Sequence, residues 1–269
     1  MKHRFVFLCL VVITFLTLLP LIWMLSSSLK HDHAVFSLPI QWIPLNPVWN
    51  NFVRIWEKIN FALFTFNSFK LSVIITVIQV FTSGFAAYGF AKCRFKGRDI
   101  LFFIYVASIA IPWQVYMLPQ YVQMGRLGLI DTHTGYILMQ SFIAFGVFLI
   151  RQFYVSIPNE LLDAARIDGL SEYGIYFKIV LPLSRPVIAT LTIFSFVNIW
   201  NDFMGPMIYF DSMHLRTIPL GIRMFLGQYS TEYGLVMAAS VVSLIPVFTV
   251  FLFFQRFFVQ GIATSGLKG

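Results

Sequence analysis

Six long apolar runs dominate the chain, and polar segments separate them. They cover about residues 5–25, 71–91, 100–118, 134–153, 186–209 and 233–254. At about 1.5 Å of rise per residue, a helix of about 20 residues crosses a hydrocarbon core about 30 Å thick. The pattern therefore predicts an all-α, polytopic membrane protein, with six transmembrane helices in a single domain over residues 1–269.

The first run has the flanks of a targeting segment. Lys2, His3 and Arg4 precede it, and three serines follow it, as in a cleavable signal sequence. The apolar core of a signal sequence is about 7 to 15 residues long, whereas residues 5–25 contain no charge at all. We therefore expect a retained membrane anchor.

Composition agrees with this pattern. Hydrophobic residues make up 58% of the 269 residues, 31 of which are Phe, and only 11% are charged. So much apolar surface does not fit into a soluble core, and a lipid bilayer is its expected environment. The net charge of +8 lies mainly in the segments between spans. Membrane topology explains it there without a nucleic-acid partner.

The Lys and Arg residues also predict the orientation in the cell membrane. With the amino terminus inside, twelve of the nineteen are cytoplasmic: Lys2, Arg4, Lys92, Arg94, Lys96, Arg98, Arg151, Arg166, Lys178, Arg185, Arg256 and Lys268. The outer segments hold the other seven: Lys30, Arg54, Lys58, Lys70, Arg126, Arg216 and Arg223. Because cytoplasmic loops carry the excess of positive charge, we expect both termini in the cytoplasm.

The polar stretch 156–182 predicts two short helices joined by a sharp turn. Ser156 is a candidate cap for the first helix, and Gly169 is expected to end it. Ser171 is a candidate cap for the second, which Pro182 should end because proline has no amide hydrogen.

Charge placement and residue spacing both support the first of these two helices. Glu160 and Asp163 place negative charge near its positive end. Asp163 and Arg166 can pair at i, i+3, and Leu161 and Ala165 share a face at i, i+4.

The same stretch resembles a known family. Asp163-Ala-Ala, then Asp168-Gly169, then Ile179, one residue and Leu181-Pro182, match the coupling loop of binding-protein-dependent ABC importer permeases, written E-A-A, G, I-x-L-P. Asp163 stands where the family has Glu. The resemblance implies the type I ABC importer permease fold. It implies these ATPase-coupling residues: Glu160, Asp163, Ala164, Ala165, Asp168, Gly169, Ile179, Leu181 and Pro182. From the residues alone, an interfacial helix pair that only joins two spans is the alternative.

Two further segments resemble the carbohydrate-specific branch of these permeases. They are Trp200-Asn-Asp-Phe203 and the tail, with Gln255 to Gly261 and Gly266 to Gly269. The resemblance implies the second of two unlike permeases in an oligosaccharide importer. It also implies a second permease, two cytoplasmic ATPase subunits and an extracellular or periplasmic sugar-binding protein. ATP and Mg²⁺ would bind to the ATPase subunits, and this chain would hold no cofactor.

Polar and aromatic residues in the spans are candidates for the substrate path. Sugars are bound by amides, carboxylates and aromatic faces, which suits Trp113, Gln140, Asn198, Asn201 and Asp202. A carboxylate inside a membrane helix is a functional candidate. Asp202 lies about 17 residues, and so about 25 Å, from Arg185. It could therefore equally lie at the outer membrane interface.

Two other function classes fit the sequence less well. An ion-gradient-driven secondary transporter is the main alternative, but it usually shows paired broken helices and internal symmetry, of which the sequence gives no clear example. A membrane enzyme would need convergent catalytic side chains. The chain has no G-x-x-x-x-G-K-[ST] loop, its five histidines are scattered, and Cys9 and Cys93 are isolated, so neither a catalytic nor a metal site is expected.

Overall fold

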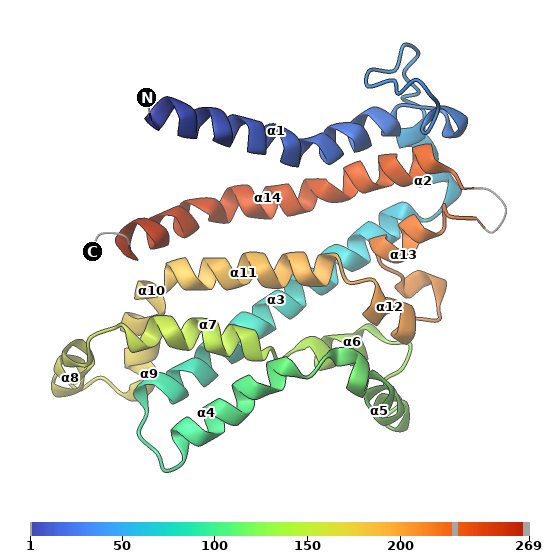
Figure 1. The fold of residues 1–269 in the computed structure, drawn as a ribbon. Coiled ribbons are helices and arrows are strands. Elements are labelled where there is room, and N and C mark those ends of the chain that lie inside the picture. Colours follow the sequence, from blue (N-terminus) through green and yellow to red (C-terminus); the bar gives the residue numbers. More distant parts are fainter. Residues whose placement is uncertain (1, 228–230, 266–269) are drawn as a thin grey trace. The chain divides into compact units, whose positions relative to one another are not determined.

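The computed structural model describes residues 2–227 and 231–265, and it divides into two compact units. The first comprises Met1–Asn67 and Arg216–Pro246, and the second comprises Ser68–Leu215 and Val247–Gly269. Figure 1 shows that the described structure is mostly helical. Its described residues form no strand, and β pairing is limited to an isolated bridge between Leu226 and Thr231. The all-α prediction is confirmed.

Three helices are each long and apolar enough to cross a membrane. They are α1 (Lys2–Ser28), α3 (Phe61–Lys92) and α14 (Tyr233–Ser265). Three bent pairs of shorter helices pass the same test when each pair is taken together. The structure thus has three spans, or up to six if each bent pair is one span.

In the first unit, polar contacts order the segment between α1 and α3. This segment contains η1 (Asp32–Ala34) and α2 (Asn51–Lys58), so the polar stretch after the first apolar run is partly helical. Asn51 Nδ2 donates to the carbonyls of Ser28 and Lys30, each at 2.9 Å. Gly234 N, at the start of α14, donates to Asp32 Oδ1 at 2.8 Å. The short helix α13 (Ile218–Arg223) completes this unit.

The predicted span 100–118 breaks before its end. Its helix α4 (Arg98–Ala107) continues into η2 (Ser108–Ala110), and α5 (Trp113–Arg126) then departs at an angle of 99°. Ile111 is extended, with φ −88° and ψ 111°, because the ring of Pro112 disfavours a helical residue before it. The expectation that one helix continues to Leu118 is wrong.

The predicted span 134–153 is also two helices, although no Gly or Pro lies at its break. These are α6 (His133–Gln140) and α7 (Ala144–Val155), at an angle of 41°. Side chains of α3 reach the carbonyls at the break: Gln79 Nε2 donates to Gln140 O at 2.6 Å, and Thr82 Oγ1 lies 3.1 Å from Ser141 O and 2.9 Å from Ile78 O, between which its one hydrogen is shared. Backbone groups freed from a helix need such partners in an apolar environment.

The predicted span 186–209 stops early. Helix α11 (Arg185–Trp200) ends before Asn201, and a separate helix, α12 (Met204–Tyr209), follows and leads to η4 (Met213–Leu215). Asp202 Oδ1 accepts a hydrogen bond from Gly205 N at 3.1 Å, in the first turn of α12. A side chain that bonds the backbone in this way competes with helix continuation.

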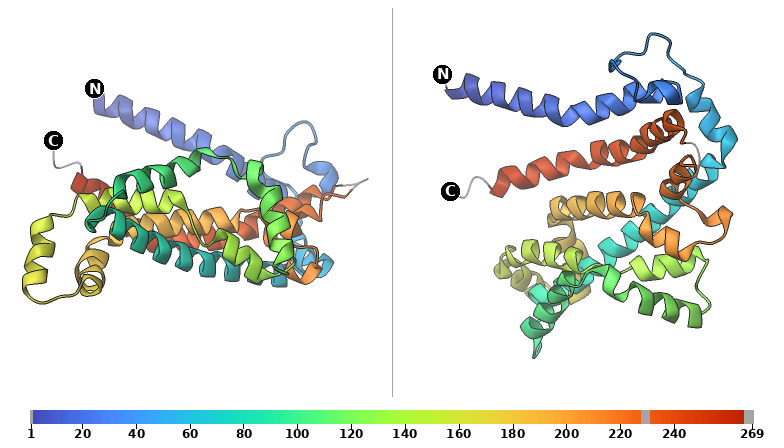
Figure 2. Two further views of the ribbon diagram at one scale, coloured as in Figure 1. Left: turned by 90° about the horizontal axis from the view of Figure 1, so that it is seen from below. Right: turned by 45° about the vertical axis from the view of Figure 1, so that its right-hand side comes forward.

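Two clusters of buried residues hold the second unit together. One joins α3, α7 and α11 through residues such as Tyr88, Ile150, Tyr154 and Leu191. The other includes Leu71, Ile75, Tyr136, Ile199 and Tyr209. In both views of Figure 2, helix α8 (Asn159–Ile167) lies at one end of this unit, beyond the end of α7. The residues predicted to line the substrate path lie near the second cluster.

Candidate functional site

A cavity of about 570 Å³ lies among α5, α6, α11 and α12 of the second unit. All five residues that the sequence marks for the substrate path line it: Trp113, Gln140, Asn198, Asn201 and Asp202. They come from four separate elements, and 89 positions separate the first from the last. The breaks in the predicted spans position several of them, since Trp113 begins α5, Gln140 ends α6, and Asn201 and Asp202 follow α11.

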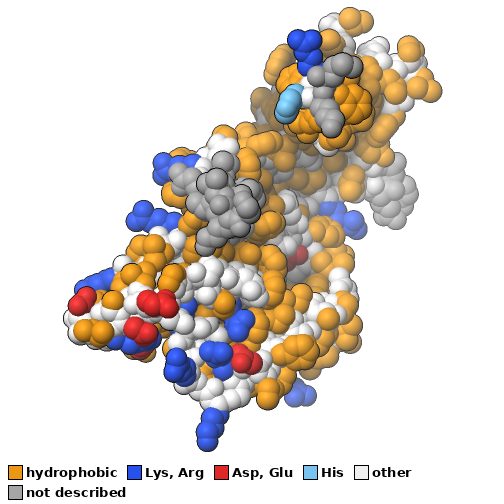
Figure 3. Space-filling view, turned by 60° about the vertical axis from the view of Figure 1, so that its left-hand side comes forward, with side chains coloured by type: hydrophobic (Ala, Val, Ile, Leu, Met, Phe, Trp, Pro, Cys, Tyr) orange, Lys and Arg blue, Asp and Glu red, His pale blue; other side chains and the backbone are white. Residues whose placement is uncertain are grey.

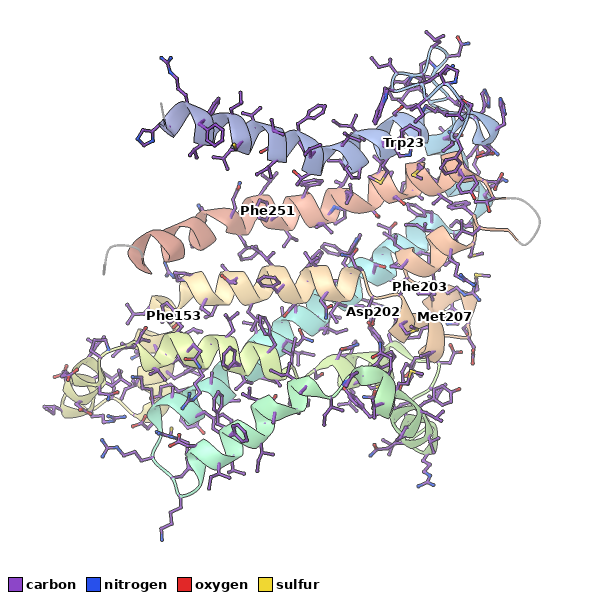
Figure 4. The ribbon with its side chains drawn as sticks, viewed as in Figure 1. Trp23, Phe153, Asp202, Phe203, Met207 and Phe251 are labelled. Atoms are coloured by element: carbon purple, nitrogen blue, oxygen red, sulfur yellow. The ribbon has the colours of Figure 1, made fainter. Side chains whose placement is uncertain are left out.

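Asp202 is held at this cavity by three hydrogen-bond donors. Tyr136 Oη donates to its Oδ2 at 2.6 Å, and Gln140 Nε2 lies 3.5 Å from the same oxygen. The amide of Gly205 donates to its Oδ1. Figure 4 shows Asp202 and Phe203 where α11 gives way to α12, with Met207 on α12. These hydrogen bonds hold the Asp202 carboxylate at the cavity, between α6 and the first turn of α12.

Gly205 allows this arrangement to close. A Cβ at this position would clash with Asp202 Oδ2 and would lie 2.9 Å from Cε2 of Tyr136. Tyr136 has little room to move because it is almost completely buried, and a shift of the Asp202 carboxylate would disturb its hydrogen bond to Tyr136. Only glycine lets the backbone of α12 approach the pair so closely.

The two asparagines differ from Asp202 in that their amides are available. Asn198 and Asn201 are exposed, and neither side-chain amide has a hydrogen-bond partner among the described residues. Trp113 is already engaged, since its Nε1 donates to Gln120 Oε1 at 2.9 Å, which fixes the indole ring at the wall. The cavity therefore combines free amides, a fixed carboxylate and aromatic faces.

Sequence reasoning missed Tyr136, which lines the same cavity and makes the shortest bond to Asp202. A signal was present. Tyr136 and Gln140 are four residues apart, so they share one face of α6, and both reach Asp202. Gln120, which follows Trp113 by seven positions, was also missed, because its role depends on a side-chain contact that the sequence alone does not show.

The stretch 156–182 has the predicted helix, turn and helix. The first helix is α8, and the second comprises α9 (Glu172–Ile175), a π-helical turn η3 (Tyr176–Val180) and α10 (Leu181–Leu183). Gly169 follows α8 with φ +82°, the left-handed conformation that glycine adopts most easily. Ser171 caps α9 as predicted, since its Oγ accepts from Gly174 N at 3.2 Å.

Two expectations about this stretch are wrong. Ser156 does not cap α8, because its hydroxyl donates to Phe153 O at the end of α7, and Pro158 occupies the cap position. Pro182 does not end the second helix, which runs on to Leu183. The π-helical turn before Pro182 already departs from the usual hydrogen-bond ladder, so the missing amide is tolerated there.

The structure shows which face of α8 is buried, which the sequence did not predict. Leu162 and Ala165 are buried, whereas Leu161 is 43% exposed, so the inward face follows i, i+3 spacing. Six of the nine predicted coupling residues are exposed, two are partly buried and Ala165 is buried. The exposed six are Glu160, Asp163, Ala164, Asp168, Gly169 and Pro182, and the partly buried two are Ile179 and Leu181.

Charged side chains tie α8 to the rest of the second unit. Arg166 pairs with Asp163 at 2.5 Å, as the i, i+3 spacing predicts, and its Nε donates to Glu172 Oε1 at 2.8 Å. Tyr88 Oη on α3 donates to the other oxygen of Glu172 at 2.6 Å. These carboxylates, with Glu172 foremost, raise the pKa of the Arg166 guanidinium. Figure 3 shows acidic and basic side chains gathered together on the face it draws.

Glu172 links parts of this stretch in a way that the sequence did not predict. It receives a bond from α8 and a bond from α3, so it links the exposed stretch to a long helix. The six-residue separation of Arg166 and Glu172 spans the Gly169 turn, which is why helical spacing gave no indication of the pair.

The family becomes clear on comparison with known proteins. The model of the family described as binding-protein-dependent transport system inner membrane component matches residues 79–264. The chain belongs to this family. Its members are permeases that do not hydrolyse ATP themselves, and separate ATPase subunits do so. The family also makes the chain a multi-pass membrane protein and sets aside the secondary-transporter alternative.

Curated relatives match almost end to end. The arabinooligosaccharides transport system permease protein AraQ of Halalkalibacterium halodurans is 35% identical over 260 residues, covering 96% of this chain and 93% of that protein. The sn-glycerol-3-phosphate transport system permease protein UgpE of Yersinia enterocolitica is 33% identical, with 93% and 92% covered. The lactose transport system permease protein LacG of Rhizobium radiobacter is 31% identical, with 93% and 91% covered.

One solved structure shows the same fold. A chain of a bacterial ABC transporter involved in the import of the acidic polysaccharide alginate superposes with a TM-score of 0.82 at 24% identity. The match covers 95% of this chain and 97% of that one. The type I ABC importer permease fold is thereby confirmed. The tail residues 266–269, which contribute to the resemblance seen in the sequence, lie outside the described residues.

Proposed function

We propose that this chain is a permease subunit of an ATP-driven, binding-protein-dependent importer of carbohydrates, with oligosaccharides as the expected cargo. The observation that carries the substrate class is the cavity. Five residues chosen for sugar chemistry from the sequence alone line one cavity in the structure. The names of AraQ and LacG, both permeases for sugars, support the same class.

We propose that sugar passes along this cavity in contact with Asn198, Asn201 and Asp202. The free amides of the two asparagines each offer donors and an acceptor, which match the hydroxyl groups of a sugar. Trp113 offers an aromatic face beside them. Asp202 lies in the short segment between α11 and α12, where Tyr136 Oη and Gly205 N hold its carboxylate at the cavity, which favours the pathway over a merely interfacial position.

The stretch 156–182 is proposed to couple this movement to ATP hydrolysis. Its exposed residues Glu160, Asp163, Ala164, Asp168 and Gly169 offer a surface for an ATPase subunit. The bonds of Glu172 to Arg166 and Tyr88 would transmit a push on α8 to α3. The family further supports a second permease, two ATPase subunits and a sugar-binding protein as partners, with ATP and Mg²⁺ bound by the ATPases.

Substitutions at the cavity test the proposal in the assembled complex. Asn201→Ala and Asp202→Asn should reduce sugar uptake, while the complex assembles and basal ATP hydrolysis persists. Asp211→Asn is the matched control, because Asp211 is an exposed aspartate that does not line the cavity. Normal uptake in both cavity variants would contradict the proposed path and would favour an interfacial role for these residues.

A further inference from the structure

The charges around the cavity are strongly one-sided. Asp202 is the only carboxylate among the described residues that line it, and none of these residues is Lys, Arg or His. The remaining lining side chains are amides, aromatic rings and methionines, with Gly205. The wall that this chain contributes is thus either neutral or negative at every point.

The carboxylate of Asp202 has hydrogen-bond partners but no positively charged partner among the described residues. Its three partners are a phenol, an amide and a backbone N–H, all of which are uncharged donors. None of these three donors brings a positive charge to the carboxylate. No cation forms an ion pair with Asp202 among the residues that the structure describes.

Cationic side chains of the same unit gather elsewhere. Lys92, Arg94, Arg98, Arg151 and Arg166 line a separate cavity of about 920 Å³ beside α8. A site for an acidic sugar is expected to offer such groups to the cargo, since guanidinium and ammonium groups pair with carboxylates and phosphates. In this chain they are placed beside the proposed coupling stretch, and the substrate cavity has none.

We infer from this charge distribution that the cavity admits uncharged sugars and disfavours acidic ones, such as uronic acids and sugar phosphates. The inference rests on the proposed carbohydrate import and narrows its substrate class. Sequence similarity does not distinguish an uncharged cargo from an acidic one. AraQ, named for a neutral cargo, and UgpE, named for a phosphorylated one, are almost equally similar to this chain, at 35% and 33% identity.

The expected size of the effect follows from electrostatics. At an effective dielectric constant of about 20, a unit charge about 6 Å from a carboxylate changes an affinity or a rate by about 100-fold. Water and salt in the cavity screen part of this interaction. We therefore expect a discrimination of about 10-fold or more between cargo or reagents of opposite charge.

The local electrostatic potential in the cavity can be measured before the transported sugar is identified. In a chain with Cys9 and Cys93 replaced by Ser, Asn201→Cys places a thiol beside Asp202. The assembled, detergent-solubilised complex is treated with a cationic and an anionic methanethiosulfonate reagent, and both rates are normalised to those with β-mercaptoethanol. A change in thiolate fraction affects both reagents equally, so the ratio of the two rates reports the local charge.

The cationic reagent should react about 10-fold faster or more, and adding Asp202→Asn should reduce this ratio at least about fivefold. Adding Asp211→Asn in place of Asp202→Asn should leave it unchanged. Asn198→Cys is a second reporter, on the last turns of α11, if the first does not assemble. A ratio near one in the parent, or a ratio that Asp202→Asn does not change, would overturn the inference.

Uptake separates this inference from the proposed function. Arabinotriose, lactose and maltotriose are compared with counterparts in which one hydroxymethyl is oxidised to a carboxylate, at concentrations that saturate the binding protein. The neutral member of a pair should enter about 10-fold faster or more, and Asp202→Asn should narrow the difference. Equal entry of both members would overturn the inference alone. A charge-selective cavity in a complex that imports no sugar would overturn the proposed function, and the substrate class with it.

Discussion

The hydroxyl of Tyr136 donates a 2.6 Å hydrogen bond to Oδ2 of Asp202, 66 residues further along the chain. This bond joins α6 to the segment between α11 and α12. Tyr136 lies inside α6, four residues before its end at Gln140, whereas Asp202 lies in the break between α11 and α12, so the bond links a helix to a break in a predicted span. Because Tyr136 is almost completely buried and Asp202 faces the cavity, the bond holds a carboxylate at the cavity wall on a buried support.

Removing the Tyr136 hydroxyl should impair transport without unfolding the chain. A hydrogen bond to a charged group contributes about 1.5–3 kcal/mol, so Tyr136→Phe should reduce sugar uptake about 10-fold or more in assembled complexes. Tyr121→Phe is the matched control, because Tyr121 packs against Tyr209 and does not line the cavity. Uptake in Tyr136→Phe equal to that in Tyr121→Phe would show that the bond does not position Asp202 for transport.

The hydrogen bonds of Glu172 to Arg166 and Tyr88 predict that removing them weakens the coupling between ATP hydrolysis and sugar transport. Glu172→Gln weakens the pair with Arg166, which is exposed and therefore adds less than about 1 kcal/mol to stability. The complex should assemble and hydrolyse ATP, with fewer sugars imported per ATP. Tyr88→Phe, which removes the other bond to Glu172, should have the same effect.

The control for these two variants is Glu57→Gln, which changes an exposed glutamate of α2 in the first unit. Transport and ATP hydrolysis are measured in the same proteoliposomes. An unchanged ratio of sugar to ATP in both Glu172→Gln and Tyr88→Phe would rule out a coupling role for this link.

Gly169 gives the sharpest test of the coupling stretch. Gly169→Pro cannot adopt φ +82° and also removes the hydrogen bond from Gly169 N to Arg166 O. The subunit should still insert and associate with its partner permease, but ATPase subunits should be lost or loosely held, with no uptake. Gly169→Ala should be milder, because a left-handed alanine costs about 1 kcal/mol and a Cβ here meets nothing within 4 Å.

Gly128→Pro is a matched control for this turn. Gly128 also has a positive φ, +66°, open space around its Cβ and an amide bonded three residues back, to Gly125 O. It lies between α5 and α6, outside the coupling stretch. Copurification of ATPase subunits with Gly169→Pro at the level of Gly128→Pro would refute the coupling assignment.

The charge asymmetry predicts which side of the membrane each loop faces. Without Cys9 and Cys93, single cysteines at Gly97 and Ser171 should resist an impermeant thiol reagent in intact cells, and one at Asn46 should react. Permeabilised cells provide the control, since all three positions should then be labelled. Labelling of Ser171 from outside intact cells would reverse the predicted orientation, and with it the cytoplasmic coupling.

Local patterns in the sequence were enough for several features. Long charge-free runs predict membrane helices because apolar length alone must match the bilayer. The turn at Gly169, the cap at Ser171 and the pair Asp163–Arg166 depend on residues at most four positions apart, and the structure contains all three. Residue type was also enough to select Trp113, Gln140, Asn198, Asn201 and Asp202 as candidates, and all five line one cavity; their contact with sugar stays a prediction.

Tertiary structure decided where the spans break and which side chains meet. No Gly or Pro marks the break between α6 and α7, which Gln79 and Thr82 support from α3, about 60 positions away in the chain. The bond of Tyr136 to Asp202 and the bond of Tyr88 to Glu172 likewise join residues more than 60 positions apart. Local spacing carries no information about such pairs, because they form only when packing brings separate helices together.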